Sequence, residues 1–217
     1  MRNRFDRQLA ELNCDLIQMG NMIEHAIELA IQALNTMDED KATAAIAYDE
    51  EIDAEEKEIE NLCFKLLLQQ QPVARDLRVI SAALKMITDM ERIGDHASDI
   101  SEVTIHLAKT GYKGNMAHVQ KMAAETTYMV VKSIEAYVEK DKEKAKEVIC
   151  HDDIVDDLFC QARKDVIDMI RQNADLGEPA TDLLMIAKYF ERIGDHATNI
   201  AEWVIFSITG IHGKKAP

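Results

Sequence analysis

An acidic heptapeptide occurs twice in the sequence, at positions that differ by 100. Glu91-Arg-Ile-Gly-Asp-His-Ala97 returns letter for letter as Glu191-Arg-Ile-Gly-Asp-His-Ala197. Residues four apart lie side by side on one face of a helix, so each copy pairs a glutamate with an aspartate. These pairs are Glu91 with Asp95 and Glu191 with Asp195. Carboxylate oxygens in such pairs are ligands that hard metal cations prefer.

The first of these pairs continues an apolar helical stripe. Ile80, Leu84 and Ile87 recur at helical spacing, and the same face then carries Glu91 and Asp95. The second copy has the same pattern. Because burying unpaired carboxylates is costly, this change from apolar to acidic indicates a function for the acids.

A second acidic pair lies earlier in each copy, on the helix expected before the heptapeptide. Asp49 and Asp53 form it in the first copy, and Asp152 and Asp156 in the second. Asp152 occupies a heptad position where an apolar residue is expected. Four converging carboxylates in each copy would make an oxygen-rich site for magnesium, manganese, calcium or iron.

Residues around the acids allow other interpretations. The acids could form ion pairs with Arg92, Arg192 or Lys85, or simply face water. The neighbouring residues that we assign to outer-shell hydrogen bonding or helix packing are Arg92, His96, Arg192, His196, Gly94 and Gly194. The two glycines weaken a helix interior, so a close helix approach is their expected role.

The duplication extends over the whole chain and predicts an all-α fold of two tandem three-helix bundles, residues 1–110 and 117–217. The chain has only 8 Gly, 3 Pro and 5% aromatic residues, a composition typical of long helices. Thr36-Met-Asp-Glu39 is a candidate capping box, and Asp40-Lys41 aligns with Asp141-Lys142. The expected helices are 5–35, 38–70, 73–109, 117–138, 141–175 and 180–208.

The composition also limits location and partners. The formal net charge of −15 makes nucleic-acid binding unfavourable. No apolar run approaches the ~18 residues of a membrane span, so we expect a cytoplasmic protein. The four cysteines form no C-x-x-C pair and are expected to be small core thiols.

These motifs resemble those of the PhoU family of phosphate-transport regulators. The resemblance rests on the twin heptapeptides, on Asp49-x-x-Ile-Asp53 with Asp152-x-x-Val-Asp156, and on Pro72-Val-Ala-Arg-Asp-Leu, and it covers essentially the whole chain. Asp89 is replaced by Tyr189 and Asp99 by Asn199 in the second copy, which could make the two sites differ in affinity or nuclearity.

The resemblance implies a non-catalytic negative regulator of phosphate uptake and of the phosphate-starvation response. It implies two protein partners, a phosphate-sensing histidine kinase and the ATPase subunit of the phosphate ABC transporter, and a homodimer. It also implies metal clusters, of iron, zinc, manganese or magnesium, on Glu91, Asp95, Glu191, Asp195, Asp49, Asp53, Asp152 and Asp156.

Two other functions remain open from the residues. A carboxylate-bridged metal-dependent oxidase would also place acids on bundled helices, but it uses Glu-x-x-His, whereas Glu91 and His96 are five apart. A purely structural scaffold would use the acids only for solubility.

Overall fold

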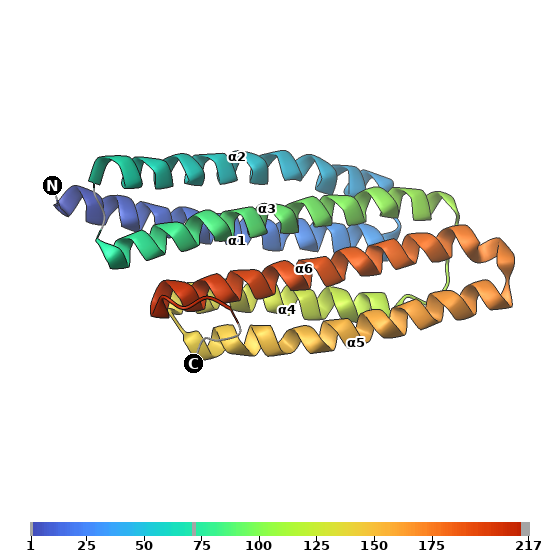
Figure 1. Cartoon of the computed structure of the whole chain (residues 1–217). Coiled ribbons are helices and arrows are strands. Elements are labelled where there is room, and N and C mark those ends of the chain that lie inside the picture. Colours follow the sequence, from blue (N-terminus) through green and yellow to red (C-terminus); the bar gives the residue numbers. More distant parts are fainter. Residues whose placement is uncertain (1, 71–72, 214–217) are drawn as a thin grey trace.

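The computed structural model describes residues 2–70 and 73–213, and this part of the chain is helical without strands (Figure 1). The six long helices and one short 3-10 helix are α1 (Arg2–Thr36), α2 (Glu39–Gln70), α3 (Ala74–Lys109), α4 (Ala117–Glu139), α5 (Lys142–Gln172), η1 (Ala174–Leu176) and α6 (Gly177–Thr209). The all-α prediction is confirmed.

The helices form two bundles of three, α1–α3 and α4–α6, which lie side by side as Figure 1 shows. Within each bundle every helix packs on the other two. The bundles meet mainly through α3 and α6, which run antiparallel along each other. The predicted duplication into two three-helix units is therefore confirmed.

Burial patterns show how the copies align. Leu16 of α1 and Val119 of α4 are both buried, as are Ile52 of α2 and Val155 of α5, and each pair is separated by 103 positions. In α3 and α6 the separation is 100, as for the buried Ile93 and Ile193. Three residues are therefore missing between the second and third helices of the second copy.

This alignment corrects two details of the sequence interpretation. Thr36 is the last residue of α1, and the cap of α2 is Asp38, whose Oδ1 accepts hydrogen bonds from Asp40 N at 3.0 Å and Lys41 N at 3.1 Å. Asp141 caps α5 in the same way. Asp38, not Asp40, is thus the counterpart of Asp141, because an aspartate one residue before a helix satisfies its free N–H groups.

The helix boundaries otherwise follow the prediction to within one residue, except that α1 begins at Arg2 rather than at residue 5 and that the α5–α6 connection differs. There α5 ends at Gln172, η1 follows, and α6 begins at Gly177 rather than at residue 180. Pro179 fits inside the first turn of α6, where the N–H that proline lacks has no helical partner.

Among the described residues no helix is long and apolar enough to cross a membrane. Of the four cysteines only Cys63 is buried, whereas Cys14, Cys150 and Cys160 are exposed, so the expectation of four core thiols was wrong. Although free cysteine is more often buried, its side chain is small enough to be tolerated on the polar side of an amphipathic helix.

Candidate acidic sites

The first acidic site lies between α2 and α3, near the middle of both helices. Asp49 reaches from α2 to the backbone of α3 at Gly94. A Cβ atom placed on Gly94 would lie only 3.1 Å from Asp49 Oδ1 and 2.9 Å from Ile52 Cδ1. Glycine at this position therefore lets the carboxylate approach α3 closely.

Asp49 is in an unfavourable electrostatic environment. Its Oδ1 atom is buried and has no hydrogen-bond partner. Burial, together with the charges of Asp95, Asp53 and Asp99, raises the pKa of Asp49 to about 6. The site therefore accumulates negative charge that the described protein atoms do not fully neutralise.

Glu91 is the second perturbed acid of this site. Its side chain is 18% exposed, and burial followed by the Asp95 charge raises its pKa to about 7. Arg92 opposes this effect, because its Nη1 lies 2.6 Å from Asp95 Oδ2 and its Nε lies 3.4 Å from Glu91 Oε2. Arg92 thus pairs with acids of its own helix.

The second acidic site, between α5 and α6, repeats this arrangement with a looser approach. Burial and the charges of Asp195 and Asp156 raise the pKa of Asp152 to about 6. A Cβ on Gly194 would lie 3.4 Å from Asp152 Oδ1, which is ordinary van der Waals contact. The pKa values of Asp156 and Asp195 are also raised, first by desolvation and then by Glu191.

The basic side chain of the second site is that of Lys188, which the sequence did not single out as a site residue. Lys188 forms an ion pair with Glu191, whose side chain is 15% exposed. The spacing of three residues could have indicated this pair. Arg192, the counterpart of Arg92, lies on the exposed side of α6.

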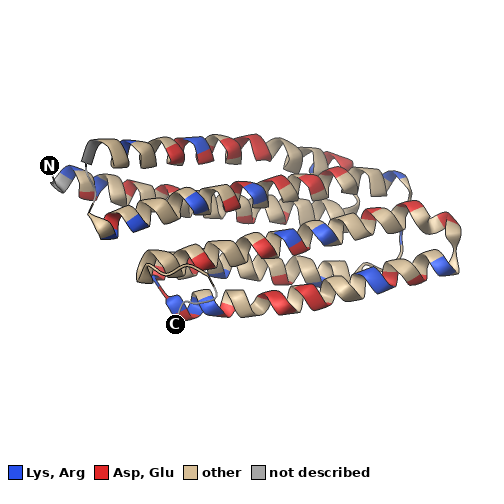
Figure 2. Ribbon diagram, in the orientation of Figure 1, with Lys and Arg blue, Asp and Glu red and all other residues tan. Residues whose placement is uncertain are grey.

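The carboxylate oxygens at both sites are ligands that suit a hard cation. A bound cation would also give the unpaired Asp49 oxygen a favourable partner. Figure 2 shows Asp and Glu along the middle of α2 and α3 and again along α5 and α6. Within residues 2–70 and 73–213, however, no three His, Cys, Asp or Glu side chains are arranged to hold one metal ion. Metal binding by the eight predicted ligands therefore stays a prediction.

The two histidines of the repeated motif lie in the interface between the bundles. Their ring centroids are 5.6 Å apart. His96 is buried, with Nδ1 3.1 Å from Asp99 Oδ2. His196 Nδ1 lies 2.8 Å from Asp89 Oδ1 on the other bundle. Both rings are thus engaged in the α3–α6 interface.

Two of the positions that differ between the copies, Asp89/Tyr189 and Asp99/Asn199, also contribute to this interface. Asp89 accepts a hydrogen bond from Asn199 Nδ2 at 3.0 Å, in addition to its contact with His196. Tyr189 lies against the His96 ring with centroids 5.6 Å apart. The differences therefore make the α3–α6 contact asymmetric. Asp99, whose counterpart is the uncharged Asn199, is also one of the charges that raise the pKa of Asp49.

Comparison with known proteins agrees with the duplicated fold. The family model described as PhoU domain matches residues 16–104 and again 119–204. A protein of Clostridium acetobutylicum named "Phosphate-specific transport system accessory protein PhoU homolog" is 38% identical over 210 residues, 96% of each chain. "Phosphate-specific transport system accessory protein PhoU homolog 1" of Thermotoga maritima is 32% identical and covers 97% of this chain and 91% of its own.

A solved structure is similar over nearly the same length. The crystal structure of PhoU from Pseudomonas aeruginosa superposes with a TM-score of 0.92 at 29% identity, covering 95% of this chain and 100% of the other.

Proposed function

Since this chain belongs to the PhoU family, we propose that it is a non-catalytic regulator of phosphate uptake and of the phosphate-starvation response. Its relatives are named as accessory proteins of phosphate-specific transport, which supports an auxiliary role. The observation that carries the proposal is the duplicated site of clustered acids with raised pKa values on packed helices, in a chain whose relatives are accessory proteins.

We further propose that the chain acts in the cytoplasm as a negative regulator between two partners. One is the phosphate ABC transporter, through its ATPase subunit, and the other is a phosphate-sensing histidine kinase. A homodimer would double the helical surfaces available to them.

Capture experiments test the partner proposal. Affinity-tagged protein, crosslinked in cells grown with ample phosphate, should recover the ATPase subunit and the kinase. Deletion of the gene should raise a phosphate-starvation reporter under the same conditions. Recovery of neither partner, together with an unchanged reporter, would contradict the proposal.

The acidic sites are proposed to hold metal ions. Asp49, Asp53, Glu91 and Asp95 would provide the ligands in the first bundle, and Asp152, Asp156, Glu191 and Asp195 those in the second. Iron, zinc, manganese and magnesium are the candidate metals. A bound cation would supply positive charge to these carboxylates, while Arg92 and Lys188, which now pair with them, would have to move aside.

Elemental analysis of the purified protein tests this metal proposal directly. The test variant carries Glu91→Ala, Asp95→Ala, Glu191→Ala and Asp195→Ala. Its matched control removes four exposed acids that lie outside both sites, through Glu28→Ala, Glu60→Ala, Glu147→Ala and Asp168→Ala. Metal should accompany the wild type and the control but not the folded test variant, and equal metal content in all three would refute the assignment.

The positions of the histidines do not favour a carboxylate-bridged metal-dependent oxidase as a second function. Such a site would need histidine ligands beside the acids. The rings of His96 and His196 instead contact Asp99 and Asp89 in the α3–α6 interface. Oxygen consumption by iron-loaded protein would contradict the proposal of a non-catalytic protein.

A further inference from the structure

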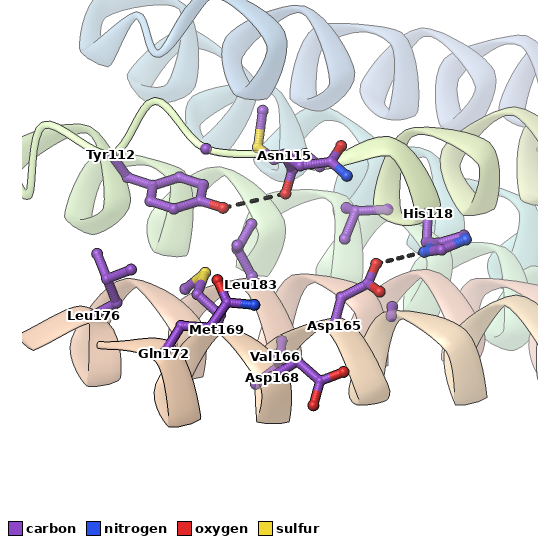
Figure 3. A pocket seen from close by; sticks show the side chains of 14 residues that line it. Tyr112, Asn115, His118, Asp165, Val166, Asp168, Met169, Gln172, Leu176 and Leu183 are labelled. Carbon is purple, nitrogen blue, oxygen red and sulfur yellow. Dashed lines mark hydrogen bonds and ion pairs between the residues drawn. The ribbon is translucent and has the colours of Figure 1, made fainter. Parts of the chain in front are cut away.

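The second bundle has an open groove where α4 begins and α5 ends. Its volume is about 430 Å³, within the range of ligand-binding pockets. Four buried apolar residues form its floor: Val119, Ala162, Val166 and Leu183. Figure 3 shows the linker side chains Tyr112 and Asn115 on one side of the groove and the α5 side chains on the other.

The first bundle shows what covers the corresponding surface there. The counterparts of the floor residues are Leu16, Ile59, Cys63 and Ala83, which are all buried. Helix α1 has 35 residues, but α4 has only 23. Because Thr36 and Glu139 are equivalent helix ends in the repeat alignment, the entire difference lies at the beginning of α1.

Residues 2–13 therefore form a helical extension without a helical counterpart in the second bundle. A hydrogen bond from Gln18 Nε2 to Glu55 Oε2, 3.1 Å long, indicates the antiparallel register of α1 and α2. In that register the extension lies along the last turns of α2 (Figure 1). Phe5 and Leu12 of the extension are buried, so it is part of the bundle core.

Because the second bundle lacks this extension, equivalent residues of α2 and α5 differ in exposure. Leu62 and Leu66 of α2 are buried, at 8% and 0% exposure. Their counterparts on α5 are Asp165, whose side chain is 53% exposed, and the partly exposed Met169. The surface that a helix covers in the first bundle is thus open in the second, where only the linker lines one side.

The charges around the groove favour a basic occupant. Its ionisable lining residues besides Tyr112 are Asp165, Asp168 and His118, and no Lys or Arg lines it, although Arg171, outside the lining, lies with Nη1 3.2 Å from Asp168 Oδ1. His118 pairs with Asp165 across the groove mouth. The α1 extension that fills the equivalent place is itself more basic than the chain as a whole, with three Arg against Asp6 and Glu11.

We infer that this groove is a docking site for a basic amphipathic helix of another protein, which covers the second bundle as residues 2–13 cover the first. About three helical turns are needed, since the extension has that length. Apolar side chains spaced i, i+4 and i+7 lie on the floor, and neighbouring Lys or Arg side chains face Asp165 and Asp168. The groove involves none of the eight acids proposed as metal ligands, so this inference does not depend on metal binding.

Methionine methyl NMR on the full-length protein tests the inference. The probe is a stapled 12-residue helical peptide with three Leu at i, i+4 and i+7, three Arg and no acids. It should cause saturable shifts of the Met116 and Met169 methyl signals, because both residues line the groove. Met19 and Met86, buried in the first bundle, should not shift.

Two controls separate groove binding from general attraction to an acidic protein. The double variant Asp165→Lys, Asp168→Lys should weaken binding at least tenfold, whereas Glu147→Lys on an exposed part of α5 should leave it unchanged. A peptide of the same composition with scrambled Leu positions should not bind. Absence of shifts at Met116 and Met169, equal binding of the scrambled peptide, or indifference to the charge reversal would each overturn the inference.

Discussion

At the scale of single residues, the acidic sites oppose folding at neutral pH. The pKa of Asp49 rises from 3.8 to about 6 and that of Glu91 from 4.5 to about 7. A carboxyl group whose pKa is higher in the folded protein gives up its proton more readily when unfolded. The free energy of unfolding therefore falls as pH rises from about 4 to about 7, and it stays lower above that window.

Asp49→Asn should remove part of this pH dependence and stabilise the metal-free protein at pH 7. A pKa shift of this size corresponds to about 3 kcal/mol for a fully desolvated group. Because Asp49 is only partly buried, screening by water reduces the expected gain to about 1 kcal/mol. Urea unfolding in chelator-containing buffer at several pH values between 4 and 7.5 measures the effect.

Asp53→Asn is the matched control, one helical turn further along α2. The Asp53 side chain is 44% exposed and lies 3.4 Å from Lys57 Nζ. Its replacement should change the stability by less than about 0.5 kcal/mol. If Asp49→Asn proved neutral or destabilising at pH 7 without metal, the ionised Asp49 carboxylate would not oppose folding, and this interpretation of the first site would be wrong.

At the scale of helices, the two sites differ in the space left beside the motif glycine. A Cβ on Gly94 would lie 2.9 Å from the side chain of Ile52, which is completely buried. A Cβ on Gly194 would lie 3.5 Å from Val155 Cγ1, without a clash. Alanine at position 94 would therefore force the Ile52 side chain to shift, whereas the α5–α6 contact tolerates alanine.

Gly194→Ala should raise the thermal stability, since alanine is favoured over glycine in a helix interior by about 1 kcal/mol. Gly94→Ala should lose this gain to overpacking, which typically costs about 1 to 3 kcal/mol. The two variants serve as controls for each other because the substitution and the motif are identical. Equal stabilisation of both, measured by calorimetry, would contradict this difference in space.

Helix number, order and most boundaries were predictable because apolar periodicity, glycines and the duplication all indicate the same elements. The residues next to each helix end were less predictable. Thr36 and Asp38 are both good capping residues, and only the backbone conformation decides that Asp38 caps α2. The sequence likewise predicted acids on facing helices, but not that His96 and His196 meet between the bundles, because that contact depends on how α3 packs on α6.

At the scale of the whole molecule, α3 and α6 connect the two bundles through apolar packing and several polar contacts. His196 contacts Asp89 at 2.8 Å, and near the other end of the interface His106 Nδ1 lies 2.7 Å from Asp182 Oδ2. Buried residues of both bundles belong to one continuous hydrophobic core. We therefore expect the chain to unfold as one cooperative unit, although each repeat resembles a complete bundle.

One probe in each bundle can test this cooperativity. Trp203 on α6 reports the second bundle by fluorescence. The buried Cys63 on α2 reports the first by its reaction with a thiol reagent, in a background carrying Cys14→Ser, Cys150→Ser and Cys160→Ser. Burial raises the pKa of the Cys63 thiol to about 12, so it should react only after unfolding. Both probes should give the same urea midpoint.

Asp89→Ala extends this test to the interface itself. It removes the acceptor of the partly buried His196 and the exposed Asn199 and should destabilise the protein by about 1 kcal/mol, because water replaces part of what these donors lose. In a cooperative molecule the midpoints of Trp203 and Cys63 move together, even though Asp89 belongs to the first bundle and Trp203 to the second. Separate midpoints would show that the two repeats unfold as independent units and not as one cooperative molecule.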